Sequence, residues 1–518
     1  MREYLRRTAT HGWIINVTPE GKQPPAANAV FNIETPVAIA LFLRGEASDE
    51  YSPAEIRYID IDGTRKEKFE ALSHLTFDDP SWRSVRTEWT APFTPAAATT
   101  WDDYPAVDDL LPWRNNGIMA GRGWVYAPSV DILEARLRDV INEDNAQAKA
   151  EKFLNADNTS LTKTKKPLPG VDTEQGTRRA FQDIPMLTQF QVVRCGYRVL
   201  DRQYVIADSR LLNRPSPKLW HGRVPDQIFA YELHSEYPRT GPGLVYTDLI
   251  PDVHHFRGSG GGRALPKIHP DGTPNLAPGL TAALRKHFGQ IVSDEEVFDY
   301  IAGIAGHSGF VAQFDDELHT PGIRIPITTD ARLWKRAVGH GRHLQWLQTY
   351  GAAGAHPKGY TDVRDCGIGT LLPSYEVAVG PGIPTSWSYN PATQTLHVGP
   401  GRWENVTREA TEYVVGGANV LTSWLNYRMA APKKRYTSPL DDINATHWSS
   451  SWSTELTELL SILTQLVNLE DQMADLLIDV IAAPQLTKDD LAGDGVKWPI
   501  SDADRQPRLV TDGTLDLR

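Results

Sequence analysis

The first 75 residues carry the pattern that most limits the fold of this chain. "MREYLRR" resembles the end of a helix, "GWIINVTP" a buried strand, and "NAVFNIETPVAIALFLRG" two further apolar runs. "AEIRYIDIDG" alternates apolar and polar residues as a strand does, and "KEKFEALSHL" follows as a helix. This order predicts the closing edge of an α/β sheet. A complete sheet of this kind needs more strands and helices before residue 10, so we expect the chain to begin within a domain.

The remaining residues predict a mixed α+β architecture. Residues 76–180 combine tryptophan-rich loops, a helix in "SVDILEARLRDVINEDNAQAKAEKFL" and a polar linker, "NADNTSLTKTKKPLPGVD". Residues 181–440 alternate short strands and loops, with a hairpin in "TSWSYNPATQTLHVG" and a helical stretch at 294–350. Residues 441–518 hold an amphipathic helix, whose apolar seam caps a core more often than it pairs with a second copy.

Composition limits the classes of function. The formal net charge of −12 argues against a general polyanion binder, so a DNA-binding surface must gather its basic residues in one place. Cys195 and Cys366 are the only cysteines, which suits a cytoplasmic protein without structural disulfides and excludes a zinc-finger pattern. No apolar run approaches about eighteen residues, so the sequence predicts no transmembrane helix and no membrane partner.

Basic charge is concentrated in "FQVVRCGYRVLDRQYVIADSRLLNRP". Arginine can bind phosphate or guanine through two N–H groups, and tyrosine offers a stacking face. In a strand, Arg194, Arg198 and Arg202 would share one face. From these residues alone two interpretations stay equally open: DNA contact, and a solvated sheet face with Asp201 paired to Arg198 or Arg202. The candidate DNA-contacting residues of this stretch are Arg194, Tyr197, Arg198, Arg202, Tyr204, Arg210 and Arg214.

A second basic segment is "LIPDVHHFRGSGGGRALP". Its glycines with Arg257 and Arg263 suit a loop that follows a phosphate backbone, although composition alone favours a mobile surface loop. The segment lacks the Lys-Ser/Thr ending of a phosphate-binding P-loop. His254 and His255 are adjacent, so in a strand they point to opposite faces and do not easily share a metal.

No catalytic constellation stands out in the sequence. The chain has no G-x-S-x-G elbow, no Walker A motif and no deaminase zinc motif. His340 and His343 have a helical spacing that permits joint metal binding, but no zincin motif surrounds them, which favours structural histidines. The sequence therefore predicts no catalytic and no metal-binding residue.

Several segments, in the expected order, resemble a known family. The first 45 residues resemble the late part of an adenine-specific DNA methyltransferase domain, and "GYRVLDRQYVIADSRLLNRP" resembles the Y-R-P-F-D-x-R-x-x-Y pattern that follows such domains. "DYIAGIAGHSGFVAQFDDELHTPGIRIPI", "HLQWLQTYG" and "EYVVGGANVLTSWLNYR" resemble later blocks. Together they resemble the C-terminal specificity region of type ISP restriction–modification enzymes, single-chain proteins that join nuclease, translocase, methyltransferase and target-recognition parts.

The resemblance implies a division of the chain and a role for its basic segments. The implied parts are a methyltransferase tail at 1–75, a helical spacer and linker at 76–180, a DNA target-recognition domain at 181–440 and a C-terminal helical segment at 441–518. DNA contact then becomes the favoured interpretation for both basic segments, including His254, His255, Arg257 and Arg263. Asp201 would brace an arginine, because a carboxylate facing phosphate is repelled.

The departures from the family pattern are equally informative. The N-P-P-Y catalytic loop and the glycine loop that binds S-adenosylmethionine do not occur, and "NPAT" at Asn390 lacks the second proline and the aromatic residue. We therefore expect no cofactor in this chain, S-adenosylmethionine only through a partner chain, and no catalysis by the chain alone. The activity that the family implies is site-specific adenine-N6 methylation of DNA.

Our hypothesis is a specificity subunit that recognises double-stranded DNA for a restriction–modification system in phage defence. Its catalytic subunit would be another chain, which would pair with the exposed sheet edge of residues 10–60. Two alternatives remain open: an active adenine methyltransferase reconstituted with that partner, and a degenerate non-catalytic scaffold.

Overall fold

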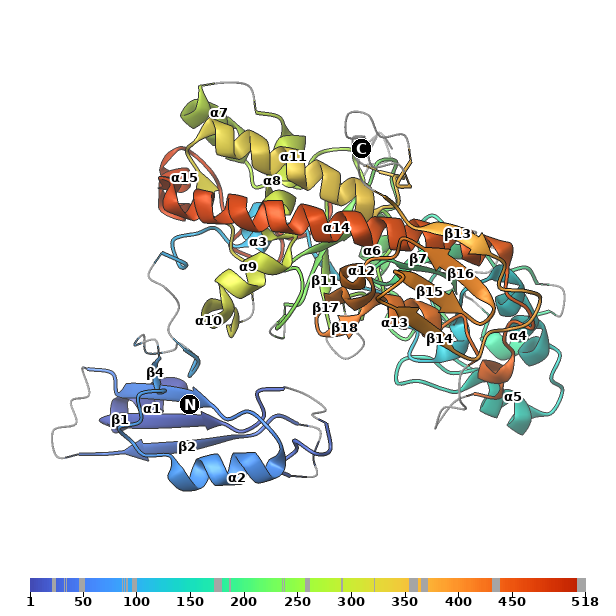
Figure 1. The fold of residues 1–518 in the computed structure, drawn as a ribbon, viewed down its shortest axis with the longest axis horizontal. Coiled ribbons are helices and arrows are strands. Elements are labelled where there is room, and N and C mark those ends of the chain that lie inside the picture. The colour runs from blue at the N-terminus through green and yellow to red at the C-terminus, as the bar shows by residue number, and fades with distance from the viewer. Residues whose placement is uncertain are drawn as a thin grey trace, which may run out of the picture. The chain divides into compact units, whose positions relative to one another are not determined.

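The computed structural model describes residues 1–20, 25–31, 33, 35–45, 52–85, 87, 89, 92–95, 100–171, 179–185, 188–234, 236, 238–256, 261–289, 292–320, 322–353, 362–364, 371–430 and 438–509. The chain divides into two compact units, and each is described by itself. Unit 1 comprises Met1–Asp103 with Phe314–Pro321, and unit 2 comprises Tyr104–Gln313 with Gly322–Arg518. Helices and strands occur in both units (Figure 1), which confirms the expected mixed α+β class.

Unit 1 is built around a four-stranded sheet of order β2-β1-β3-β4. β1 pairs with β3 in parallel and with β2 in antiparallel fashion, and β4 pairs antiparallel with β3. The expected helices at Arg2–Thr8 and Arg65–His74 and the expected strands at His11–Asn16 and Glu55–Asp60 are confirmed. Of the two apolar runs expected within residues 28–45, only Ala38–Leu43 forms a strand among the described residues. The elements of unit 1 are α1 (Arg2–Thr8), β1 (His11–Asn16), β2 (Ala38–Leu43), β3 (Glu55–Asp60), α2 (Arg65–His74), β4 (Arg83–Ser84) and α10 (Asp315–Leu318).

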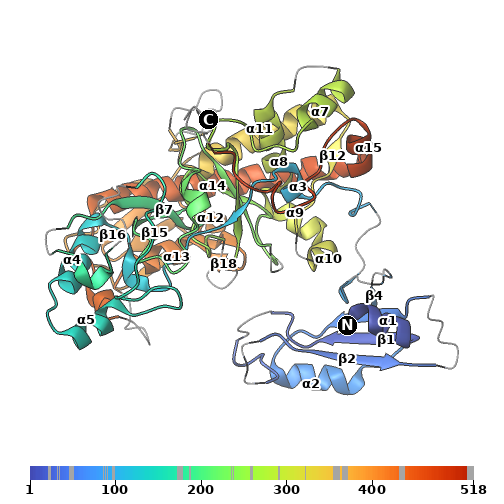
Figure 2. The same ribbon diagram turned by 180° about the vertical axis from the view of Figure 1, so that it is seen from behind.

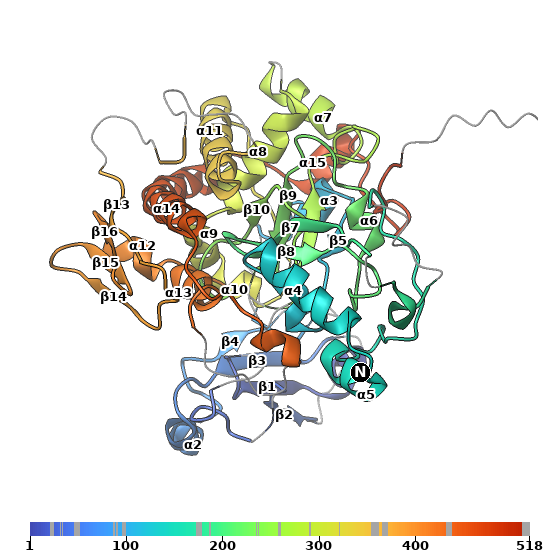
Figure 3. The ribbon, with the colours of Figure 1, turned by 90° about the vertical axis from the view of Figure 1, so that its right-hand side faces the viewer.

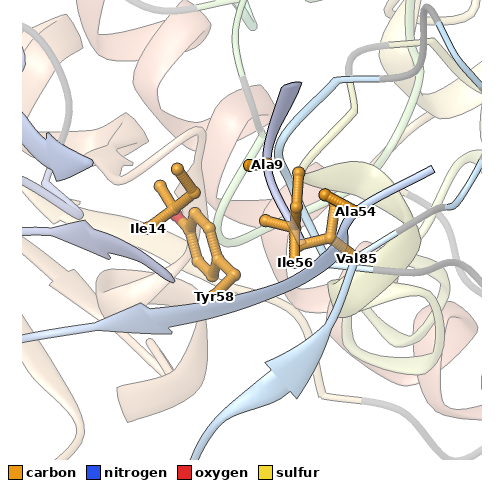
Figure 4. Packing of buried hydrophobic residues seen from close by; sticks show 6 residues of the cluster. All are labelled: Ala9, Ile14, Ala54, Ile56, Tyr58 and Val85. Atoms are coloured by element: carbon orange, nitrogen blue, oxygen red, sulfur yellow. The ribbon is translucent and has the colours of Figure 1, made fainter. Parts of the chain in front are cut away.

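Alternation along β1 and β3 gives the sheet of unit 1 a buried cluster on each face. Figure 4 shows the first cluster, in which the strand residues pack with a residue that follows α1; its members are Ala9, Ile14, Ala54, Ile56, Tyr58 and Val85. The second consists of Ile15, Val17, Val30, Ile59 and Ile61, with Leu72 and Leu75 from α2 and its C-terminal end packed against it. A capping box between Thr64 and Glu67 begins α2, which explains where that helix starts.

Unit 2 contains most of the helices. They are α3 (Val107–Leu110), α4 (Val130–Ile141), α5 (Ala146–Phe153), α6 (Pro217–Trp220), α7 (Leu280–Phe288), α8 (Asp294–Ala305), α9 (Ser308–Gln313), α11 (Ala331–Gln348), α12 (Arg408–Glu412), α13 (Val420–Asn426), α14 (Ser450–Ala482) and α15 (Lys488–Gly493). Among the described residues, short 3-10 helices lie at Gly123–Val125, Phe181–Asp183 and Pro439–Asp442. None of the described helices is both long enough and apolar enough to span a membrane.

The strands of unit 2 form small sheets. The larger ones have the orders β6-β8-β7, β10-β9-β11-β5 and β13-β16-β15-β14. The strands are β5 (Asn115–Asn116), β6 (Tyr126–Ala127), β7 (Val192–Arg198), β8 (Asp201–Ile206), β9 (Phe229–Glu232), β10 (Val245–Thr247), β11 (Arg263–Pro266), β12 (Ile327–Thr328), β13 (Ser374–Val377), β14 (Trp387–Asn390), β15 (Thr395–Val398), β16 (Gly401–Glu404), β17 (Val414–Val415), β18 (Ala418–Asn419) and β19 (Gln485–Leu486). The antiparallel pair β14–β15 confirms the hairpin expected from "NPATQ".

Two glycines let α8 and α11 pack closely (Figure 2). A Cβ atom at Gly341 would lie 1.8 Å from the carbonyl oxygen of Asp299, and one at Gly303 would lie 2.0 Å from that of Ala337. Both distances are far below van der Waals contact, so any side chain here would force the helices apart.

The long helix α14 belongs to the core of unit 2. Its predicted apolar seam, which runs from Leu456 to Val480, is buried, and this confirms a core-capping helix. Figure 3 shows the β13–β16 sheet beside this helix, and Trp403 Nε1 of β16 donates to Thr457 Oγ1 of α14 at 2.9 Å. Glu470, which interrupts the seam, is buried and accepts hydrogen bonds from Ser308 N and from the Tyr413 hydroxyl.

Two local expectations differ from the structure. The helix expected at 130–154 is two helices, α4 and α5, and the Asn145 side chain caps the second by accepting from Gln147 N and Ala148 N. The expected linker at 155–172 is anchored to unit 2 where it is described: Leu168 is buried, and Ser209 Oγ donates to Lys166 O at 2.6 Å. The division into four parts with boundaries at 75, 180 and 440 stays a prediction.

Candidate nucleic-acid interface

The first basic segment forms the β7–β8 hairpin of unit 2. Arg198 is opposite Asp201, so the turn consists of Val199 and Leu200. Leu200 has a φ of 58°, a left-handed conformation that costs a branched side chain about 1 kcal/mol. The carbonyl of Leu200 accepts from the Tyr350 hydroxyl at 2.7 Å, which helps to hold the turn.

The hairpin overturns the expectation that Arg194, Arg198 and Arg202 share one strand face. Arg194 is opposite Tyr204 and Gly196 is opposite Arg202, so Arg194 and Arg202 lie on the same face. A register irregularity between Gly196 and Arg198 separates Arg198 from them.

Arg194 and Arg202 both pair with α14. Arg194 forms an ion pair with Glu455, and Arg202 forms one with Glu458 at 3.2 Å. Their guanidinium groups also lie over aromatic rings, Arg194 at 5.2 Å from the centroid of Tyr204 and Arg202 at 3.5 Å from that of Tyr350. These contacts orient the two arginines, and each still has N–H groups beyond the one in its ion pair.

Asp201 does brace an arginine, but not Arg198 or Arg202. It is buried, and its Oδ1 pairs with Nη1 of Arg428 at 2.9 Å. Arg198 instead pairs with Asp252, at 3.1 Å, and covers the ring of Tyr197 at 4.1 Å. Neighbouring residues of a strand point to opposite sides, so Asp201 faces the interior of unit 2 while Arg202 points to the other side of β8.

The last two arginines of this segment differ in the exposure of their side chains. Arg210 is buried and pairs with Asp208 through Nε at 2.9 Å and Nη2 at 2.5 Å. Arg214 is exposed, and its backbone N and O pair with Met119. Of the two, Arg214 is the one whose side chain a macromolecule can reach without disturbing the fold.

The structure brings the second basic segment next to the first. Gly196 N donates to Ile250 O at 3.0 Å, and Asp252 N donates to Gly196 O at 2.9 Å, so this segment runs alongside β7. A Cβ atom at Gly196 would lie 3.0 Å from Cε1 of His255, which explains a glycine here. His255 is buried with Nδ1 2.8 Å from Gly196 O, and burial lowers its pKa to about 4. It is therefore neutral at pH 7.

The other predicted residues of this segment have different surroundings. His254 is part-exposed, with Nδ1 3.4 Å from Asp252 Oδ1. Arg263 pairs with Glu232 at 2.5 Å and with Asp108 at 3.0 Å. Arg257 lies outside the described residues. DNA contact by these residues stays a prediction.

His340 and His343 lie on α11. Burial lowers the pKa of both, that of His343 to about 4. Within the described ranges, neither belongs to a group of three side chains placed to hold a metal ion.

A cavity of about 790 Å³ opens beside the hairpin. We call it the tyrosine–arginine cavity. Its walls come from distant parts of unit 2: residues within 119–136, the hairpin, residues 252 and 254, residues 426–430 and residues within 441–445. Three predicted DNA-contacting residues, Tyr197, Arg198 and His254, contribute to its lining.

Three tyrosines meet at this cavity. The ring of Tyr197 lies 4.8 Å from that of Tyr126 and 4.9 Å from that of Tyr427. The Tyr126 hydroxyl donates to buried Asp252 at 2.7 Å, and burial raises the pKa values of Tyr126 and Tyr197 well above their usual value. Tyr126 and Tyr197 are therefore neutral at pH 7, and the cluster of three rings forms an aromatic part of the cavity wall.

The sequence interpretation missed several residues of this cavity: Arg122, Tyr126, Arg136, Tyr427 and Arg428. Two of them could have been found from the sequence, because Tyr427 and Arg428 end "EYVVGGANVLTSWLNYR", a segment that resembles a block of the family. For the others the sequence held no signal, because their role depends on segments far apart in the chain meeting in space.

Comparison with known protein families identifies both the class of protein and the family. Residues 109–459, more than half of the chain, match the model of a specificity domain. The family is the Type ISP C-terminal specificity domain, and the chain belongs to it. A comparison with curated proteins gives no significant match.

Solved structures show a similar fold. A nuclease-deletion mutant of the Type ISP restriction–modification enzyme LlaGI with a DNA substrate mimic has a TM-score of 0.59 and 15% identity, over 92% of this chain and 37% of that one. The ATP-dependent Type ISP restriction–modification enzyme LlaBIII bound to DNA has a TM-score of 0.60 and 14% identity, over 93% of this chain and 31% of that one. A DrdV–DNA complex has a TM-score of 0.60 and 15% identity, over 91% of this chain and 48% of that one. The chain spans less than half the length of each.

Proposed function

We propose that this chain recognises a specific sequence of double-stranded DNA for a restriction–modification system. The observation that carries the proposal is the family match, because residues 109–459 contain both basic segments and the tyrosine–arginine cavity. Phosphate contacts would position the chain, and contacts to base edges would give it specificity. The three similar proteins named above were each solved with DNA or a DNA mimic, which supports the same ligand here.

We further propose that unit 1 is the closing edge of a methyltransferase sheet, completed by a catalytic partner chain. β2 pairs only with β1 among the described strands, and Ile39, Leu41 and Leu43 are 38%, 42% and 53% exposed. A strand edge with exposed apolar side chains is a template for another strand. A partner strand on β2 would bury these side chains.

We propose that unit 1 does not bind S-adenosylmethionine by itself. Open sheets with parallel strands bind such ligands at the carboxyl ends of the strands. Those ends carry Asn16 and Asp60, and Asn16 Nδ2 already donates to Asp60 Oδ1 at 2.7 Å. Asp60 also accepts from the Tyr58 hydroxyl at 2.8 Å and from Arg83 at 2.5 Å. We propose that the partner binds the cofactor.

A mobility-shift assay tests DNA recognition. We expect the chain to bind a random duplex pool with an affinity that falls as salt rises, because bound phosphates release counterions. Arg202→Ala together with Arg214→Ala should weaken binding by about 1–3 kcal/mol. Arg332→Ala is the matched control, since its side chain is 92% exposed and lies outside both basic segments. Absence of binding, or affinity that does not fall with salt, would contradict the proposal.

The open edge of β2 favours one of the two alternative functions, a methyltransferase reconstituted with the partner. Mixing this chain with a chain that carries N-P-P-Y should then give methyl transfer to adenine in DNA. Leu41→Lys, which places charge on the exposed face of β2, should reduce complex formation, whereas Phe69→Lys on α2, 51% exposed, serves as a control away from the strand edge. No methyl transfer by the mixture would exclude this alternative.

A further inference from the structure

Two of the four arginines that line the tyrosine–arginine cavity, Arg122 and Arg136, form no ion pair with a described carboxylate. Arg122, Arg136, Arg198 and Arg428 line it, against Asp252, Asp441 and Asp442. Arg198 pairs with Asp252, and Arg428 pairs with Asp201, which is buried and does not line the cavity. Asp441 accepts from Ser438 N at 3.0 Å and caps the short helix at Pro439–Asp442.

Arg136 has no carboxylate partner among the described residues, but its donors are satisfied. Nη1 donates to Trp124 O at 3.2 Å and to Tyr126 O at 2.8 Å. Nε and Nη2 donate to Ile443 O at 3.0 Å and to Asn444 Oδ1 at 3.1 Å. Arg136 is thus a structural clamp between α4 and the cavity walls.

Arg122 is different. It is 5% exposed, its Nη2 donates to Thr159 Oγ1, and its guanidinium lies 4.4 Å from the ring centroid of Phe153. Nε and Nη1 are buried without a hydrogen-bond partner, and burial alone, with no described carboxylate, shifts the pKa of this group. Burial lowers the pKa of Arg122 to about 10. It is still charged at pH 7, so the fold bears the cost of an uncompensated buried cation.

The aromatic wall lies close to Arg122 along the chain. Tyr126 follows Arg122 by four positions, which limits their Cα separation to about 14 Å. Tyr197 and Tyr427 are part-exposed, and exposed Asn426, next to Tyr427, adds an amide to the lining. Rings suit stacking by a base, and an amide suits pairing with a base edge.

We propose that the tyrosine–arginine cavity binds a nucleoside phosphate, with the phosphate beside Arg122 and the base against Tyr427 and Asn426. The inference rests on the proposed function and extends it, because it assigns to the specificity domain a pocket for one unstacked nucleotide. The phosphate would give Nε and Nη1 of Arg122 the acceptors that they lack. In a duplex, only a nucleotide turned out of the stack could enter.

Calorimetry of the full chain with each of the four deoxynucleoside 5′-monophosphates tests the pocket directly. We expect saturable binding of at least one of them. Arg122→Met should weaken it about tenfold or more, because a charge-assisted contact is lost. Tyr427→Ala and Asn426→Ala should weaken it too, while Arg332→Ala should not.

Thermal unfolding distinguishes a ligand-binding role from a structural one. Since Arg122 is buried without a counter-charge, Arg122→Met should keep or raise the midpoint of unfolding while it weakens nucleotide binding. Arg136→Met, which removes the clamp, should lower the midpoint. A large drop for Arg122→Met with unchanged nucleotide affinity would show a structural role and overturn the proposal.

Competition identifies the source of the nucleotide and separates this inference from DNA recognition. If the cavity takes a nucleotide of DNA, a duplex with a central mismatch should displace the monophosphate, and Arg122→Met should weaken the mobility shift. If a free nucleotide is the ligand, the monophosphate binds but duplex does not displace it. Failure of every monophosphate to bind a chain that still shifts duplex DNA overturns the pocket and leaves DNA recognition standing.

Discussion

Arginines of one basic segment can have different roles, as the ion pair of Arg210 with Asp208 shows. Both side chains are 2% exposed, and two hydrogen bonds join them. The sequence presents Arg210 as a candidate DNA contact of the same kind as Arg214, because local charge does not reveal burial. Only Arg214 is exposed.

Removal of Arg210 alone tests its structural role. Arg210→Met would leave the carboxylate of Asp208 buried without its counter-charge, so we expect a loss of about 3–5 kcal/mol in the free energy of unfolding of unit 2. Urea denaturation followed by tryptophan fluorescence measures it. Arg332→Met, at an exposed site, should stay within about 0.5 kcal/mol of wild type. A loss of the same small size for Arg210→Met would contradict the pairing.

His255 gives the fold a dependence on pH. Its pKa is lowered to about 4 by burial, so the folded chain keeps it neutral where the unfolded chain protonates it, below about pH 6.5. Stability from this residue is full above pH 6.5 and is lost as pH falls toward 4. His255→Gln should therefore lose less thermal stability than wild type between pH 7 and pH 5. Parallel pH profiles for the two proteins would show that His255 is not held neutral.

At the scale of elements, period and spacing predicted the helices α1 and α2, the strands β1 and β3, the β14–β15 hairpin and the buried seam of α14. They overestimated the strands of residues 28–45, where only β2 forms among the described residues. The β7–β8 turn was not predictable, because Leu200 takes a left-handed φ without the glycine or asparagine that signals it. That turn decides which arginines share a face. The break between α4 and α5 also escaped the apolar periodicity, although Asn145 is a strong helix cap.

The packing of α14 can be tested on its two faces. Leu463 is fully buried, whereas Ile478 is 60% exposed. Leu463→Ala should cost about 2–5 kcal/mol because it removes buried methyl groups and leaves a cavity. Ile478→Ala should cost less than about 1 kcal/mol, since it changes exposed surface. Equal losses in urea denaturation would contradict the burial of the predicted seam.

At the scale of the whole molecule, the family resemblance could be identified from short motifs, but the candidate site could not. The tyrosine–arginine cavity joins Arg122, Tyr197, Asp252 and Tyr427, which belong to four separated segments. Of these four residues only Tyr197 is itself a predicted DNA contact, and only Asp252 lies close in the sequence to another one, His254. An unpaired buried arginine is a property of the folded environment, so no composition or spacing rule identifies Arg122.

The central claim is that the chain reads a DNA sequence. The most direct measurement is selection of binding sites from a random duplex pool, followed by comparison of the affinities for the selected and a scrambled duplex at one salt concentration. We expect that one sequence is enriched and that it binds at least about 10³-fold more tightly than the scrambled duplex. Equal affinity for the two duplexes would contradict it.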